Sequence, residues 1–248
     1  MTLQVILNSF ASEVFRKQAD YDYIAARMNY KMRLRQQFLW SGQQAVEKYL
    51  KSILLYNGKS ARFFDDQGKK KEFGHNLILL NNEVNKISDL NYKLPNWSEE
   101  FILYLTELGG FNRYMTEISY STPDGLHKLD ELVWNIRKYC QYIPDRVLGH
   151  KNEIPKMKKS MINYINNKSH KDNPNKFKLI GGELEKILEL PNQDPARKAL
   201  VWANLYYGKN NKKIVKYRPM SCMEIPPQHR DWFTVETNKK IISDYVKL

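Results

Sequence analysis

Apolar residues between positions 38 and 58 recur at steps of three and four, which is the spacing of one face of an α-helix. Polar residues fall on or beside the other face, where Glu47 and Lys51 stand four apart in the order that favours pairing along a helix. Asn57 and Gly58 supply a typical helix end, because glycine readily adopts the left-handed conformation needed there. The pattern predicts one long amphipathic helix that packs inside a helical bundle.

A second periodic stretch covers residues 9–34 and predicts the first long helix. Positions along it alternate by fours and threes, as in the seam by which one helix packs along another. We therefore expect this seam to pack against a neighbouring helix. Its members are Val14, Gln18, Tyr21, Ala25, Met28 and Met32.

A loop and a third helix follow the central helix. Residues 58–74 are polar and punctuated by glycine, so we interpret them as a loop. The third helix runs from His75 to about residue 87. His75 stands where it could cap this helix or pack against the central one.

Two more helices complete the predicted bundle. One covers residues 97–120 and contains Gly109 and Gly110, which mark a break or a close approach to a neighbouring helix. The other covers residues 126–142 and carries an apolar stripe that we expect to be buried. The stripe consists of Leu129, Leu132, Val133, Ile136 and Tyr139 or Cys140.

The pattern changes after the fifth helix, where glycine, proline and charged residues predict a domain edge or linker. We therefore divide the chain into a helical bundle, residues 1–148, and a basic C-terminal extension or small second domain, residues 149–248. Asp194 followed by Pro195 is a typical helix start. The elements predicted in the extension are helices near 156–167, 182–190, 195–207 and 238–247, and a strand at 212–218.

The charge is uneven along the chain. The net charge is +13, and residues 151–248 contribute +10 of it, from 20 lysines and arginines against 10 acidic residues. The positive electrostatic potential of this region favours partners that carry phosphate, with RNA or DNA first and an anionic membrane surface second. A solvated basic surface without a partner is the alternative.

The two cysteines, Cys140 and Cys222, are too few for a disulfide framework. No stretch reaches the roughly 18 to 20 apolar residues that a membrane span needs. The sequence also contains no glycine-rich phosphate loop, no paired Cys or His metal spacing and no nucleophile elbow. We expect a cytoplasmic protein that holds no metal or cofactor and does not span a membrane.

Two phrases stand out in this helical frame: Gln44-Ala45-Val46-Glu47-Lys48, and His75-Asn76-Leu77 after the loop. Over residues 10 to 145 the chain resembles the HEPN family, whose small helical domains occur in bacterial toxin and defence systems. That family includes metal-independent ribonucleases, nucleotide-binding members and inactive interaction domains. The resemblance implies an all-α, up-and-down HEPN-like helical bundle, to which this chain adds a basic, mostly helical C-terminal extension.

HEPN ribonucleases typically carry an arginine followed four to six residues later by a histidine on the last core helix. A histidine can act as acid or base near neutral pH, and the arginine binds the scissile phosphate. The resemblance places the arginine at Arg137, but Tyr142 stands in the histidine position, and tyrosine is a poor base at pH 7. Arg146 and His150 form a second pair spaced by four. These four residues are the candidate catalytic residues.

A second constellation lies near the C-terminus, where cations alternate with aromatic residues. Backbone charge and base stacking both contribute to binding of single-stranded nucleic acid, so this composition predicts a binding surface for it. The candidates are Lys209, Lys212, Lys213, Lys216, Tyr217, Arg218, Arg230 and Trp232.

Three functions are open at this point. We expect a HEPN protein of a bacterial toxin–antitoxin or antiphage defence system that interacts with RNA or nucleotides without cleavage, because the Arg–His motif is incomplete. The alternatives are an active metal-independent endoribonuclease toxin and a non-catalytic scaffold subunit that binds only protein. The resemblance also implies a homodimer through the last core helices, and a partner nucleotidyltransferase or defence effector.

Overall fold

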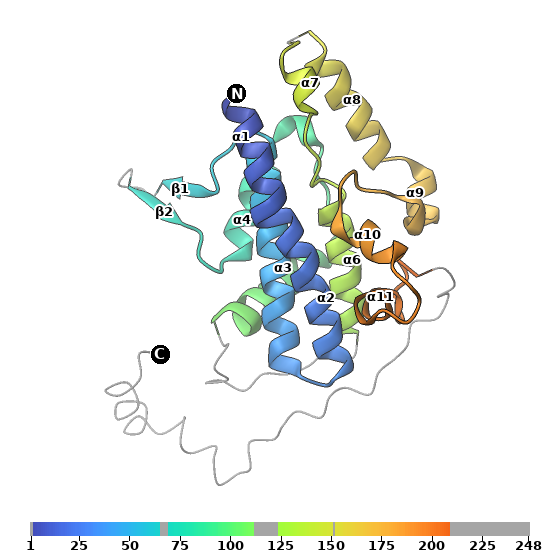
Figure 1. Cartoon of the computed structure of the whole chain (residues 1–248). Helices are drawn as coiled ribbons and strands as arrows, with labels where there is room; N and C mark the ends of the chain where they lie inside the picture. Colours follow the sequence, from blue (N-terminus) through green and yellow to red (C-terminus); the bar gives the residue numbers. More distant parts are fainter. Residues whose placement is uncertain (1, 65–68, 112–123, 151, 209–248) are drawn as a thin grey trace.

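The computed structural model describes residues 2–64, 69–111, 124–150 and 152–208, whose regular secondary structure is helical apart from one short hairpin (Figure 1). This confirms the predicted all-α class. The helices up to residue 137 are α1 (Leu3–Phe10), the π-helical η1 (Ala11–Arg16), α2 (Lys17–Lys31), α3 (Arg35–Tyr56), α4 (Leu77–Asn85), the 3-10 turn η2 (Ser88–Leu90), α5 (Ser98–Tyr104), the π-helical η3 (Leu105–Phe111) and α6 (Gly125–Arg137). The later ones are α7 (Asp145–Leu148), α8 (Ile154–Ile165), α9 (Lys168–Asp172), the 3-10 turn η4 (Pro174–Lys176), α10 (Glu183–Glu189) and α11 (Pro195–Val201).

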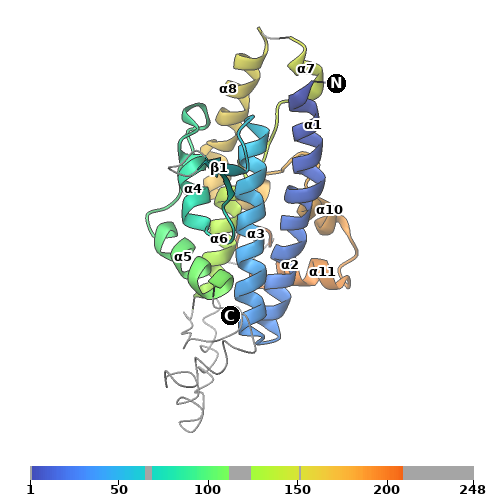
Figure 2. The same cartoon turned by 90° about the vertical axis from the view of Figure 1, so that its left-hand side faces the viewer.

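Helices α1, η1 and α2 follow one another without a break, so the first helix begins earlier than predicted, at Leu3. The chain then reverses through a short link in which Arg33 adopts the left-handed conformation, with φ 62°. Helix α3 runs back beside α2, and the two lie side by side in both views (Figures 1 and 2). A link this short makes the two helices antiparallel neighbours.

The predicted seam of the first helix faces solvent rather than the bundle, so that prediction was wrong. Val14, Tyr21 and Met28 are 43%, 43% and 38% exposed, whereas Asp20 and Arg27 on the inner face are fully buried. The reason is that these two charges have partners in distant segments. A pattern based on apolar spacing assigns charged residues to solvent and therefore selects the wrong face.

Helix α3 lies at the centre of the core, as predicted, and most of its side chains are buried. It also ends at the predicted residues. Gly58 adopts φ 68°, its N–H donates to the carbonyl of Leu55 at 3.0 Å, and the N–H of Lys59 donates to Leu54 at 2.9 Å. These bonds satisfy carbonyls that the last helical turn leaves free.

Part of the predicted loop 58–74 is a short antiparallel hairpin of β1 (Arg62–Phe64) and β2 (Lys70–Glu72). An exposed ion pair at 2.9 Å joins Arg62 of one strand to Glu72 of the other. Helix α4 then begins with Asn76 as its cap, because the Asn76 side chain accepts a hydrogen bond from Leu79 N–H. His75 instead packs against the central helix, where its ring approaches the carboxylate of Glu47 at 3.1 Å.

Gly109 allows η3 to approach the central helix closely. A Cβ atom at this position would lie 2.6 Å from the carbonyl oxygen of Leu39 and 2.9 Å from Cβ of Gln43. Both distances are too short for any side chain, so the glycine is required by the packing. The close approach predicted from the sequence is therefore confirmed, while residues 112–120 of the predicted helix lie outside the described residues.

We expect Gly109→Ala to lower the free energy of unfolding by about 1–3 kcal/mol, because η3 and α3 must separate to admit the methyl group. Gly149→Ala is the matched control, since a Cβ there would meet nothing within 4 Å. Urea unfolding of both variants measures the difference. An equal loss at the two positions would contradict the packing argument.

The described part of the extension packs along one side of the bundle (Figure 1). Its buried side chains belong to the same core cluster as those of α3 and α6; they are Ile165, Phe177, Leu179, Leu184, Ile187, Ala199, Leu200 and Tyr207. Helix α11 starts as predicted, with the Asp194 side chain accepting from the N–H groups of Ala196 and Arg197. The predicted strand at 212–218 and helix at 238–247 lie outside the described residues.

Candidate functional site

Helix α6 carries Arg137, the first candidate catalytic residue, into the core. Its predicted apolar stripe is buried throughout, including both Tyr139 and Cys140 just after the helix. No residue from Asp124 to Cys140 is exposed. The last core helix is thus enclosed by the helices around it.

Arg137 is 1% exposed and lies between two carboxylates. Its Nε and Nη2 donate to Asp20 at 2.7 and 2.8 Å, and its Nη1 and Nη2 donate to Glu185 at 2.9 and 2.6 Å. Burial lowers the pKa of the guanidinium, but the two carboxylates outweigh burial and hold that pKa well above its ordinary value. Arg137 is therefore a charged and fully paired group.

Asp20 joins three parts of the chain at this point. Besides Arg137, it accepts the hydroxyl of Tyr49 on α3 at 2.5 Å. It also accepts the backbone N–H groups of Glu183 and Leu184, at 2.9 and 3.2 Å. These groups lie at the start of α10, where free N–H groups favour an anion. One buried carboxylate thus fixes α3, α6 and α10 together.

Glu185 contributes the second carboxylate from the extension. Burial raises the pKa of Glu185, but the adjacent Arg137 outweighs burial and holds that pKa below its ordinary value. The carboxylate also accepts the N–H of Leu179 at 2.9 Å. Glu185 is thus held as an anion against Arg137.

Tyr142 packs against other residues. Its ring lies 5.3 Å from that of Tyr56, and the guanidinium of Arg16 lies 6.0 Å from its centre. Arg16 in turn donates to the carbonyl of Gly181 at 2.9 Å. Tyr142 is half-buried in this cluster.

Arg146 and His150 lie in and just after the short helix α7, and both are exposed. No hydrogen bond, ion pair or ring contact joins any two of Arg137, Tyr142, Arg146 and His150, all of which are among the described residues. The structure therefore does not assemble the four candidates into one site.

The family model of the HEPN domain matches residues 12–143, which is more than half of the chain. The chain belongs to the HEPN family. Neither the curated proteins nor the solved structures contain a match. Glu185 lies outside the HEPN match, so part of the environment of Arg137 comes from the extension.

A basic surface follows the HEPN domain in the described part of the chain. Residues 152–180 contain seven lysines against Glu153 and Asp172, which gives a net charge of +5. Lys158 forms an ion pair with Asp89 at 3.4 Å. Five lysines are exposed and form no ion pair with described residues: Lys156, Lys159, Lys168, Lys176 and Lys178. We call these five residues the basic edge.

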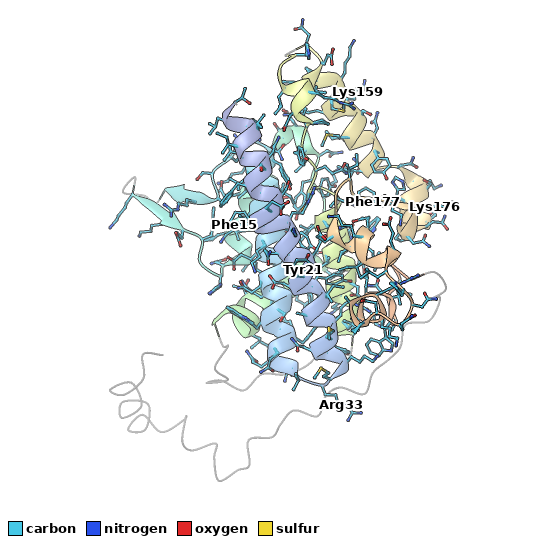
Figure 3. The ribbon with its side chains drawn as sticks, in the orientation of Figure 1. Phe15, Tyr21, Arg33, Lys159, Lys176 and Phe177 are labelled. Atoms are coloured by element: carbon cyan, nitrogen blue, oxygen red, sulfur yellow. The ribbon has the colours of Figure 1, made fainter. Side chains whose placement is uncertain are left out.

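The basic edge is held in shape by Tyr164. Its hydroxyl accepts the N–H of Lys178 at 3.1 Å and lies 3.2 Å from the Lys178 carbonyl. Its ring lies 5.2 Å from that of Phe177, so α8 and the segment after η4 are joined. Figure 3 shows Lys159 and Lys176 on the outer side of the molecule, over α8 and α9.

The basic edge was not predicted from the sequence, although a Lys-rich helix is visible near 156–167. The predicted binding residues were instead those in which cations alternate with aromatic side chains. All of these lie outside the described residues; they are Lys209, Lys212, Lys213, Lys216, Tyr217, Arg218, Arg230 and Trp232.

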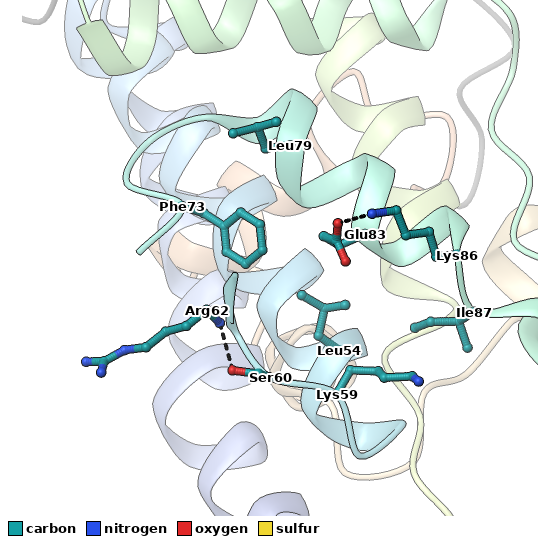
Figure 4. A pocket seen from close by; sticks show the side chains of 9 residues that line it. All are labelled: Leu54, Lys59, Ser60, Arg62, Phe73, Leu79, Glu83, Lys86 and Ile87. Atoms are coloured by element: carbon teal, nitrogen blue, oxygen red, sulfur yellow. Dashed lines mark hydrogen bonds and ion pairs between the residues drawn. The ribbon is translucent and has the colours of Figure 1, made fainter. Parts of the chain in front are cut away.

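A hollow of about 420 Å³ lies between the end of α3, the hairpin and α4. Figure 4 shows Leu54, Phe73 and Ile87 around it, with the Arg62 side chain extending away. The hollow is thus lined by apolar and polar residues together, and two of its cations, Arg62 and Lys86, already pair with Glu72 and Glu83.

The described residues form neither a metal site nor a membrane span. No group of three or more His, Cys, Asp or Glu side chains there is placed to hold a metal ion. None of the helices described is both long enough and apolar enough to cross a bilayer.

Proposed function

We propose that this HEPN protein binds RNA without cleaving it, as a component of a bacterial toxin–antitoxin or antiphage defence system. The observation that carries the proposal is the basic edge, whose five exposed lysines have no acidic partner among the described residues. Unpaired surface cations bind backbone phosphates and release counterions, which makes such binding sensitive to salt. The positive charge of residues 209–248 adds to the same attraction.

The environment of Arg137 supports binding without cleavage. A cation that stabilises the transition state must reach the scissile phosphate, whereas Arg137 is buried and bonded to Asp20 and Glu185. Proton transfer also needs a group that titrates near pH 7, and Tyr142 stands in the position of the family histidine. Arg137 and Tyr142 therefore do not meet these two requirements of the family's ribonucleases.

The test is a gel that resolves shift and cleavage of labelled single-stranded RNA, with EDTA present. We expect a salt-sensitive shift, without cleavage, that Lys159→Glu/Lys176→Glu weakens by about tenfold. The matched control is Lys86→Glu/Lys186→Glu, which changes the net charge equally but replaces lysines already paired with acidic residues. We expect the control to bind nearly as well as wild type.

Other outcomes would favour the alternative functions. Cleavage by the wild-type chain in the presence of EDTA would establish a metal-independent endoribonuclease and contradict the proposal. The absence of any shift would favour a scaffold that binds only protein, such as a partner nucleotidyltransferase or defence effector. Equal weakening by both double variants would reject the basic edge as the binding surface.

A further inference from the structure

Tyr164 is an exposed aromatic residue within the basic edge. The exposed aromatic side chains of the described residues are Phe10, Tyr21 and Tyr164, and Tyr164 is 37% exposed. Phe10 and Tyr21 lie on the first helix, outside the basic edge. Tyr164 lies instead at the end of α8, among lysines that have no acidic partner in the described part of the chain.

The ring of Tyr164 is the outermost of four packed aromatic rings. It lies 5.2 Å from the ring of Phe177 and 4.7 Å from that of His170. The Phe177 ring lies in turn 6.4 Å from that of Trp134 on α6. The three inner rings are buried. The cluster thus runs from the core to the surface and ends in a ring that is partly exposed.

Hydrogen bonds also hold Tyr164 in place. Its hydroxyl accepts the N–H of Lys178 at 3.1 Å and donates to the Lys178 carbonyl at 3.2 Å. Its backbone carbonyl accepts the Nδ1–H of His170 at 2.8 Å. A ring that is already held loses little conformational entropy when a flat ligand packs on it, which favours binding.

Lysines of the basic edge lie along the chain before and after this ring. Lys178 is bonded to the Tyr164 hydroxyl, and Lys176 and Lys168 stand one and two residues before the ring neighbours of Tyr164. On α8 itself, Lys159 stands five residues before Tyr164, about 7.5 Å along the helix axis. Figure 3 shows Lys176 beside α9 and Lys159 further along α8.

We infer that Tyr164 forms a stacking subsite for an unpaired RNA base, so that the basic edge favours single-stranded over double-stranded RNA. This subsite rests on the proposed RNA binding of the basic edge. Lysines on either side of the ring bind the phosphates that flank a nucleotide, and the base between those phosphates packs on the exposed part of the ring. A base within a duplex is already paired and stacked, so it offers no free face.

The subsite belongs to the extension rather than to the HEPN domain. Tyr164, His170 and Phe177 all lie after residue 143, where the family match ends. The five lysines of the basic edge lie after it as well. The extension therefore supplies the ring and the cations together, and the preference for an unpaired strand does not depend on Arg137.

Fluorescence anisotropy with labelled oligouridylate tests the subsite in the wild-type chain. The comparison ligands are an abasic strand with the same number of phosphates, and a uridylate–adenylate duplex with the same total number of phosphates. We expect oligouridylate to bind about tenfold more tightly than the abasic strand, because stacking of a base adds a factor of this order, and also more tightly than the duplex. Equal binding of oligouridylate and the abasic strand would overturn the subsite.

Tyr164→Leu removes the ring but keeps an apolar side chain. We expect this variant to bind oligouridylate about tenfold more weakly, with the same dependence on salt, because no phosphate contact is lost. Its affinity for the duplex should stay unchanged. Tyr164→Phe keeps the ring and should bind nearly as well as wild type. The matched control is Tyr21→Leu, which removes an exposed tyrosine outside the basic edge and should leave binding unchanged.

The outcomes distinguish this subsite from the proposed function. If Lys159→Glu/Lys176→Glu weakens binding and Tyr164→Leu does not, the basic edge binds RNA without a stacking subsite. Equal weakening of strand and duplex by Tyr164→Leu would also contradict the subsite, because the substitution would then act through the shape of the basic edge. A wild-type chain that binds no RNA would overturn the proposed function and the subsite together. If Tyr164→Leu does not fold, the comparison of oligouridylate with the abasic strand decides.

Discussion

Replacing Asp20 with alanine should lower the free energy of unfolding by about 3–5 kcal/mol, the cost of breaking a buried ion pair by removing one partner. The substitution removes two acceptors of Arg137 while the guanidinium stays buried. It also leaves the hydroxyl of Tyr49 and the N–H groups of Glu183 and Leu184 without their acceptor. Each loss adds to the desolvation cost, because water cannot replace the carboxylate inside the core. Urea unfolding followed by circular dichroism measures the change.

Asp22→Ala is the matched control for Asp20→Ala. Asp22 lies on the same helix and is also paired with a cation, Lys48, but its side chain is 29% exposed. Solvent screens a pair of this kind, so we expect a loss below about 1 kcal/mol. If Asp20→Ala and Asp22→Ala lowered the free energy of unfolding by similar amounts, burial would not explain how much Asp20 contributes to stability.

Arg27→Met should also cost about 3–5 kcal/mol, because it leaves Asp130 as an unpaired buried carboxylate. Burial already raises the pKa of Asp130 above its ordinary value. The substitution also removes the donor to the carbonyls of Ala199 and Trp202, which attaches the C-terminal end of α11 to α2. Urea unfolding of this variant should therefore show a much lower midpoint than wild type.

The double variant Arg27→Met/Asp130→Leu separates pairing from packing. Replacing both partners of a buried pair by apolar residues of similar volume is often close to neutral. We therefore expect the second substitution to recover part of the lost stability, because the carbonyls of Ala199 and Trp202 stay without the Arg27 donor. Lys128→Met removes a cation from a more exposed pair with Asp124 and should change the stability by less than about 1 kcal/mol. A double variant less stable than Arg27→Met would contradict this account.

The sequence predicted those parts of the fold that depend on local patterns. Gly58 ended the central helix as expected, and the stripe through Leu129 and Ile136 lies in the core, because apolar periodicity reports burial directly. The inner face of the first helix could not be predicted in this way. Asp20 and Arg27 are buried because they pair with Arg137 and Asp130. These partners lie more than 100 residues away along the chain, so local patterns do not reveal them.

The candidate site could be predicted only where a local motif marks it, and not where it depends on residues far along the chain. The family motif located Arg137, but its burial depends on Glu185, which stands 48 residues further along and belongs to no motif. The absence of histidine at Tyr142 was visible at once. The lysines of the basic edge are visible in the sequence. Only the fold shows that five of them are exposed and have no acidic partner among the described residues.

The attachment of Glu185 to Arg137 bears on where this protein can be divided. The HEPN match ends at residue 143, but a chain shortened to that limit would lose Glu185 and the carbonyls of Ala199 and Trp202. Two buried arginines would then be short of acceptors. We therefore expect a chain cut at residue 143 to be less stable than the full chain, so the extension is best altered by point substitution rather than by deletion.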